Sequence, residues 1–177
     1  METKLKLIQP AIAILCVLSV YGTPAMADKI FFRMEPIQGE SSDKQHRDWI
    51  ELTGFTTAAK GVQKGGVSNI GPLILTKVLD KSSVLFAHAV SEGRHFQEAI
   101  LEQWRGSETR RLGLQLKLED VVVVNRELSM DVDKDISIRE SVSLEFGKIT
   151  REYYPTSPDG SAMRPVRSCW DLRSNER

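Results

Sequence analysis

Residues 38–52 read Gln-Gly-Glu-Ser-Ser-Asp-Lys-Gln-His-Arg-Asp-Trp-Ile-Glu-Leu, and this stretch carries the pattern that best predicts the fold. A short apolar segment, Ile30-Phe31-Phe32-Arg33-Met34, precedes it, and a second segment suited to a strand runs from Trp49 to Thr57. β-branched and aromatic residues favour strands, whereas Gly, Ser and Asp favour turns. The stretch therefore predicts a strand, a polar turn and a second strand at the start of a β-rich domain.

The clearest periodicity lies farther along the chain. Polar or small residues alternate there with Leu112, Leu114, Leu116 and Leu118. Strict alternation predicts a half-buried strand, which continues into the β-branched run 121–124. A second such strand holds apolar residues at 142, 144 and 146, and the pattern then changes parity to Ile149. We expect a β-bulge at Gly147-Lys148 to restore the facing, and a polar surface connection over 125–137 between the two strands.

One helix is predicted from about Ser83 to Ser91, with the hydroxyl of Ser82 or Ser83 capping its first turn and Gly93 at its exit. The following segment, 95–104, is ambiguous because its apolar residues also fit a helical stripe. The glycine-bearing stretch 58–71 and the proline-bearing stretch 154–165 predict loops. A short strand around 166–172 is expected to close the chain.

The first 27 residues have the features of a secretory signal peptide. Lys4 and Lys6 form a basic start, residues 11–20 form an apolar run, and a small-x-small pattern predicts cleavage between Ala27 and Asp28. The apolar run is far shorter than the ~20 residues that span a bilayer, so no stable membrane insertion is expected. The predicted organisation is a leader, 1–27, followed by a single domain, 28–177.

The charge balance argues against nucleic-acid and membrane partners, and the cysteine content excludes an internal disulfide. The whole chain holds 24 basic and 24 acidic residues, and removal of a leader with two lysines and one glutamate leaves a net charge near −1. Such a balance provides no global field for nucleic acid or an anionic membrane. Only Cys169 remains after cleavage, so the domain forms no internal disulfide, and the state of that thiol is left open.

No pattern in the chain predicts catalysis, a metal or a cofactor. The three histidines, His46, His88 and His95, lack the spacing of a zinc site, and His46 is expected to make hydrogen bonds within the opening turn. The acidic run from Asp131 to Asp135 lacks the glycine and the final glutamate of a calcium loop. Neither a phosphate-binding loop nor a nucleophile elbow occurs.

Several segments, in their order along the chain, together resemble the Hcp (hemolysin-coregulated) proteins of the bacterial type VI secretion system. The first is the Gly-Glu-Ser-x-Asp-x-x-His turn followed by Ile-Glu-Leu. The others are residues 79–86, 93–101, 118–122 and 139–146, and the closing Cys169-Trp170-Asp171-Leu172-Arg173-Ser174-Asn175. The resemblance covers nearly all of residues 28–177.

The resemblance implies a mainly β fold, an Hcp-like β-barrel of two packed antiparallel sheets with one short α-helix, and a strand rather than a helix at 95–104. It also implies a structural subunit that is not an enzyme and uses no cofactor. Hcp proteins form homohexameric rings that stack into a hollow tube, which associates with sheath and spike proteins and carries effectors. By analogy, Gly61, Gly65 and Gly66 belong to a loop that reaches the neighbouring ring, and Thr56 faces the lumen.

Two alternatives stay open. A signal peptide departs from the family, whose members assemble in the cytoplasm and leave through the type VI machinery; translation from Met26 would give that cytoplasmic start, whereas cleavage after Ala27 gives a periplasmic or secreted protein. The second possible function is an exported, monomeric Hcp-fold binding module outside any tube. Arginines 105, 110 and 111 are interpreted either as a solvated turn or as partners in interfacial salt bridges.

Overall fold

The computed structural model describes residues 28–60, 69–106, 110–131, 135–174 and 176. This part of the chain is built mainly from strands, with one helix. In chain order the elements are β1 (Lys29–Arg33), β2 (Ile50–Leu52), β3 (Gly54–Thr56), β4 (Ala59–Lys60), β5 (Asn69–Ile70), β6 (Leu73–Val78), α1 (Ser82–Glu92), β7 (His95–Arg105), β8 (Arg111–Asp131), β9 (Asp135–Tyr153) and β10 (Val166–Asp171).

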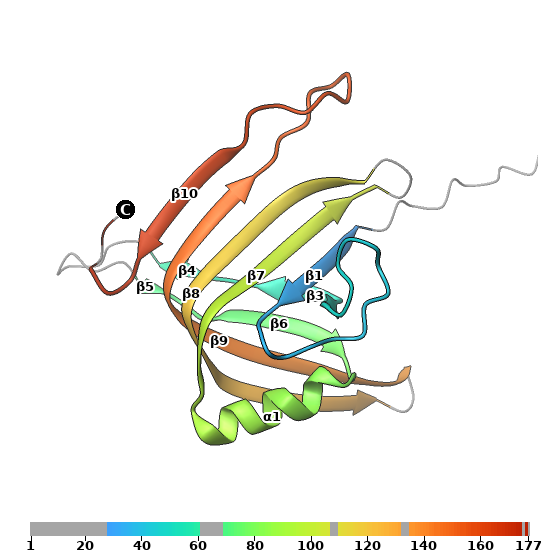
Figure 1. Ribbon diagram of the computed structural model, residues 1–177, viewed down its shortest axis with the longest axis vertical. Helices are drawn as coiled ribbons and strands as arrows, with labels where there is room; N and C mark the ends of the chain where they lie inside the picture. The colour runs from blue at the N-terminus through green and yellow to red at the C-terminus, as the bar shows by residue number, and fades with distance from the viewer. Residues whose placement is uncertain (1–27, 61–68, 107–109, 132–134, 175, 177) are drawn as a thin grey trace, which may run out of the picture.

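Eight strands form one antiparallel sheet that curls into a nearly closed barrel (Figure 1). Their order is β2-β1-β7-β8-β9-β6-β3, and β10 pairs with β9 beside this path. β2 and β3 are separated only by Thr53, and they pair with β1 and β6 respectively. The Thr53 N–H donates to the carbonyl oxygen of Thr76 at 2.8 Å. One bent segment thus joins both ends of the sheet, and the expected mainly β barrel with a single helix is confirmed.

The wall of the barrel turns a corner along a line that crosses three strands. Gln97 of β7, Asp120 of β8 and Gly147 of β9 lie at the same level, between paired neighbours whose register does not change. Buried positions change parity there on each strand, from Phe96 to Ala99 on β7 for example. Asp120 has a left-handed backbone (φ 56°), and a Cβ on Gly147 would lie 3.1 Å from its carboxylate.

The structure at this corner differs from one prediction of the sequence analysis. The expected bulge at Gly147-Lys148 is wrong, because Glu119 pairs with Lys148 and Val121 with Phe146 without a register shift. The parity change is shared by three neighbouring strands instead, so no strand needs an extra residue at that level. A register shift between β8 and β9 occurs farther along, between Val123 and Asn125.

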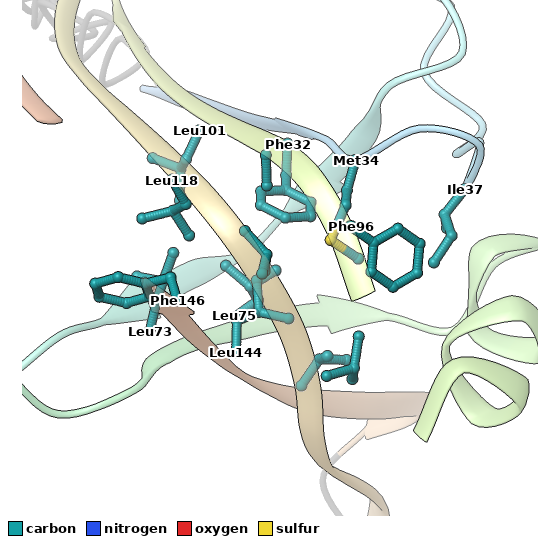
Figure 2. Close-up of a cluster of buried hydrophobic side chains, with 14 of the residues drawn as sticks. Phe32, Met34, Ile37, Leu73, Leu75, Phe96, Leu101, Leu118, Leu144 and Phe146 are labelled. Carbon is teal, nitrogen blue, oxygen red and sulfur yellow. The ribbon is translucent and has the colours of Figure 1, made fainter. Parts of the chain in front are cut away.

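The core fills the barrel between its opposite walls and continues beneath the helix (Figure 2). Apolar residues of six strands meet there, together with the helix residues Phe86 and Ala89. Figure 2 labels Phe32, Met34, Ile37, Leu73, Leu75, Phe96, Leu101, Leu118, Leu144 and Phe146. Burial of this apolar surface, at about 25 cal/mol per Å², is the main force that holds the walls together.

β8 and β9 stay paired beside β6, almost to the end of their hairpin. Leu128 pairs with Glu140 and Ser129 with Arg139, so the strands extend far into the range 125–137. The prediction of a surface connection over that whole range is therefore wrong. Residues 127–130 are exposed, and a strand that is wet on most of its surface lacks the alternation that identifies half-buried strands.

The helix and the remaining connections largely follow the sequence. α1 occupies the predicted range and ends at Gly93, whose left-handed conformation (φ 60°) suits the exit. The predicted serine cap is wrong: the N-cap position is Lys81, and no side chain caps the helix from there. The segment 95–104 is strand β7, as the family resemblance implied. Within 58–71, β4 and β5 form a small two-stranded sheet, and β10 is the expected closing strand.

Candidate functional site

The opening turn lies between β1 and β2, and its packing requires glycine at position 39. The Gly39 N–H donates to the carbonyl oxygen of Asp48 at 2.8 Å, which draws the two sides of the turn together. A Cβ at this position would lie 2.3 Å from the Trp49 carbonyl oxygen and 2.5 Å from the Ile50 Cα. Both are backbone atoms that cannot rotate away. The glycine of the sequence motif is thus explained by a close approach of two chain segments.

The next two motif residues attach the turn to its surroundings. The Glu40 carboxylate accepts a hydrogen bond from the Lys81 N–H at 2.9 Å, just before α1 begins. Ser41 is buried, and its hydroxyl donates to Glu51 Oε1 of β2 at 2.8 Å. Asp80 Oδ1 accepts a further hydrogen bond from the Ser82 N–H at 2.8 Å. Glu40 and Asp80 therefore supply the polar contacts at the helix start that were expected from Ser82 or Ser83.

His46 is the centre of the turn and is only 2% exposed. Its Nδ1 lies 2.9 Å from Asp43 Oδ1, and its Nε2 lies 2.9 Å from Glu102 Oε2 on β7. The ring stacks on Phe31, with centroids 4.1 Å apart, and the edges of Trp49 and Trp104 complete its surroundings. The expected hydrogen-bonding role of His46 is confirmed, because both ring nitrogens contact carboxylates that anchor the turn to the barrel wall.

Both carboxylates of this network are held in the charged form. Burial by itself would raise the pKa of Asp43, but hydrogen bonds from His46 and Arg110 outweigh it and place the pKa well below its usual range. Burial opposes ionisation of Glu102 too, yet hydrogen bonds from His46, Trp104 and Gln115 lower its pKa. We call Asp43, His46, Glu102 and Arg110 the turn network.

A second buried network lies under the start of α1. Lys77 of β6 is fully buried, and its Nζ donates to Asp80 Oδ1 at 2.8 Å, to Glu140 Oε2 at 3.0 Å and to Ser83 Oγ at 3.0 Å. Glu140 of β9 also accepts hydrogen bonds from Ser83 and Arg126. Burial would raise the pKa of Glu140, but these hydrogen bonds and the charge of Lys77 lower it. We call Lys77, Asp80, Ser83, Glu140 and Arg126 the helix network.

Sequence reasoning predicted the hydrogen-bonding role of His46 in the turn network, but it missed Glu102 and Arg110 as its partners and missed the helix network entirely. In the sequence, Lys77 follows a run of apolar residues and resembles the exposed end of a strand. Glu140 resembles a solvent-exposed charge just before the alternating apolar residues that begin at 142. No local signal marks the pair, because the two residues lie on different strands and are brought together by the pairing of β6 with β9.

The chemistry of these networks is structural. Both nitrogens of His46 are engaged, and the other histidines are exposed and lie beside single carboxylates, Glu92 for His88 and Asp120 for His95. In the described part of the chain, no group of three or more His, Cys, Asp or Glu side chains is placed to hold a metal ion. Within the same residues, no helix is long and apolar enough to cross a membrane.

The sheet also presents an edge that suits contacts with other chains. Among the described strands, β10 pairs with β9 alone, so its other side offers backbone groups for pairing. Its first residue, Val166, is 64% exposed, and Arg167 and Ser168 are exposed as well. Cys169 is half-buried on this strand and accepts a contact from Thr150 Oγ1 at 3.5 Å.

Most of the residues predicted for assembly lie outside the described part of the chain. Gly61, Gly65 and Gly66 fall outside the described residues, as does Ala27. Thr56 is exposed at the end of β3. Asp28 accepts a hydrogen bond from Gln103 of β7 at 2.6 Å, so the chain enters the barrel directly at the predicted cleavage point.

A nearly closed barrel with structural polar networks and an unpaired strand edge is typical of a class of protein that assembles with other chains. Comparison with known proteins agrees with that class. Residues 31–153 match the family model described as "Type VI secretion system effector, Hcp". The chain is 28% identical to Protein hcp1 of Pseudomonas aeruginosa over 160 residues, which cover 85% of this chain and 98% of the relative.

Solved structures give the same result. One described as a type six secretion system protein superposes with a TM-score of 0.77 at 26% identity, covering 85% of this chain and 99% of the other. The crystal structure of Hcp1 from Salmonella typhimurium superposes with a TM-score of 0.71 at 24% identity, again over 85% and 99% of the two chains. The chain belongs to the Hcp family of type VI secretion proteins.

Proposed function

We propose that this protein is a structural subunit of a type VI secretion inner tube, in which homohexameric rings stack and carry effectors. Membership of the Hcp family is the observation that carries the proposal. The role needs no catalytic residues, which agrees with polar networks whose donors and acceptors are used within the protein. Sheath and spike proteins are the further partners that this role requires.

The geometry of the sheet supports assembly through a head-to-tail contact. The β10 edge and the end of the hairpin formed by β8 and β9 are different surfaces that lie on different sides of the barrel (Figure 1). A contact between two unlike surfaces generates a ring when the rotation closes. Such a contact would also cover the open edge, which otherwise favours uncontrolled pairing.

The proposal assigns roles to residues that the sequence singled out. The loop with Gly61, Gly65 and Gly66 would reach the neighbouring ring, and the exposed Thr56 would face the lumen. The leader 1–27 would be removed between Ala27 and Asp28 in an exported form, whereas translation from Met26 would produce a cytoplasmic subunit secreted by the type VI machinery.

The test is the native mass of residues 28–177 over a range of concentrations, by sedimentation velocity. We expect a hexamer in the unmodified protein. Val166→Lys places a second positive charge beside Arg167 on the β10 edge and should shift the population toward smaller species. Val84→Lys is the matched control, because Val84 is 74% exposed on α1, away from that edge. A monomer at every concentration would contradict the tube role and favour a monomeric binding module.

A further inference from the structure

A groove at one end of the barrel is not explained by the proposed tube role. It lies between the end of β7, the start of β8 and the segment that follows β9, and it has a volume of about 420 Å³. Its apolar walls include Trp104, Leu112, Pro155 and Met163, and Met163 is 54% exposed. A volume of this size suits a few side chains of a bound segment.

The charge of the groove is one-sided. Arg110 and Arg111 line it, and none of the described residues that line it is acidic. Arg111 is exposed and makes no ion pair or side-chain hydrogen bond with any described residue. The nearby carboxylates are already engaged: Asp43 by His46 and Arg110, and Glu152 by Tyr154 and Arg167. The groove therefore presents positive charge beside an apolar surface.

Arg110 has donor capacity that the fold does not use. Its Nη1 bonds to Asp43, while its Nε and Nη2 are buried without a hydrogen-bond partner in the described structure. The guanidinium lies over the rings of Phe31 and Trp104, 5.4 Å from each centroid. Because these two donors are buried, Arg110 acts on the groove through its positive charge and not through a donor that an incoming group reaches.

We propose that this groove binds an extended, acidic segment of a partner protein. One carboxylate of the segment pairs with Arg111 and adds negative charge beside Arg110, and a neighbouring apolar side chain packs against Trp104 and Met163. A peptide with alternating acidic and apolar residues matches both halves of the lining. Two arginines on a domain without net positive charge do not provide the field that a nucleic acid would need.

The test uses residues 28–177 and a fluorescein-labelled peptide in which glutamate and leucine alternate, with binding followed by fluorescence anisotropy. The control peptides replace glutamate with lysine or leucine with serine. Arg111→Glu should weaken binding at least about 10-fold, because it turns an attraction into a repulsion. Ala162→Trp, at a residue that lines the groove, should block binding by filling it. The matched control is Arg94→Glu, because the Arg94 guanidinium lies over Phe96 outside the groove. The affinity of this variant for the glutamate peptide should stay within about 2-fold of the unmodified protein.

Circular dichroism of each variant verifies that it is folded. The assignment is overturned if the lysine peptide binds as well as the glutamate peptide, or if both groove variants bind like the unmodified protein. It is also overturned if no peptide binds while Arg111→Glu lowers the native mass. That last result would identify the groove as a contact between copies of this chain, whereas a failure of the tube role would leave peptide binding intact.

Discussion

The two buried polar networks of the barrel differ in how they are built, and the difference shows where the fold is most vulnerable. In the turn network only Asp43 and His46 are close in sequence, whereas Glu102 and Arg110 come from farther along the chain. Each carboxylate has a donor besides His46, namely Arg110 for Asp43 and Gln115 for Glu102. The helix network is centred on Lys77 and Glu140, which are both buried and lie opposite each other on the neighbouring strands β6 and β9. Glu140 keeps Ser83 and Arg126 as donors when Lys77 is lost, but the loss leaves a fully buried carboxylate without its ammonium partner, so we expect it to cost more than the loss of His46.

The largest effect is expected from Lys77→Met. This change leaves Glu140 buried without its ammonium partner, and removal of one member of a buried pair costs about 3–5 kcal/mol of unfolding free energy. Urea denaturation of residues 28–177 measures it. Lys117→Met is the control, because Lys117 pairs with Glu98 at 2.7 Å on the surface, where such pairs contribute about 1 kcal/mol or less.

The double variant Lys77→Met with Glu140→Leu sharpens this prediction. It removes both buried charges, and replacement of a whole pair by apolar residues is often nearly neutral. We expect the double variant to be more stable than Lys77→Met alone. If the two changes were simply additive, Lys77 and Glu140 would not form the coupled pair described above.

Gly39→Ala should have the next largest effect and tests the turn from its backbone side. The added methyl would overlap backbone atoms of Trp49 and Ile50, and overpacking of this kind costs about 1–3 kcal/mol, so we expect a loss near the upper end. Gly54→Ala provides the control, since nothing lies within 4 Å of its added Cβ. Equal stability of both variants in urea would show that the turn adjusts freely.

His46→Phe should be milder than Lys77→Met. The ring stack on Phe31 is retained, but Asp43 and Glu102 each lose a donor, and we expect a loss of about 2 kcal/mol. His88→Phe, at an exposed position of α1, should change stability by less than about 0.5 kcal/mol. A loss for His46→Phe as large as that for Lys77→Met would contradict the contrast between the two networks.

The smallest effect is the change that Glu102→Gln makes in the pH dependence of the unfolding free energy. The pKa values of Asp43, Glu102 and Glu140 are all lowered in the folded protein, so each carboxylate stabilises the fold above its ordinary pKa. That contribution is lost as the pH falls below roughly 4. The unfolding free energy should therefore drop on acidification, with a shallower slope in Glu102→Gln than in the unmodified protein. A fold that gained stability in acid would contradict the sign of these shifts.

The sequence predicted most of the fold because the opening turn is a contiguous motif. Gly39, Ser41, Asp43 and His46 each make contacts within or next to the turn, so their spacing alone reflects the structure. The alternation of leucines likewise identified β8, and the glycine at 93 marked the end of α1.

Periodicity failed where the strands stop behaving as flat, half-buried ribbons. On β7 the buried side changes at the corner, so Phe96 and Ala99 are both buried, and a spacing of three residues imitates a helix. Near the end of β8, residues Glu127 to Met130 are exposed, and this part of the strand resembles a loop. The pair of Lys77 and Glu140 could not be found by any local rule, because only strand pairing brings them together.

Negative-stain electron microscopy of purified residues 28–177 tests the central claim most directly, because it images the assembly itself. The account predicts closed rings with an open centre in end-on views, and stacked rings at high protein concentration. Isolated compact particles without a central opening, at concentrations where family membership implies assembly, would contradict the claim that this barrel is a tube subunit.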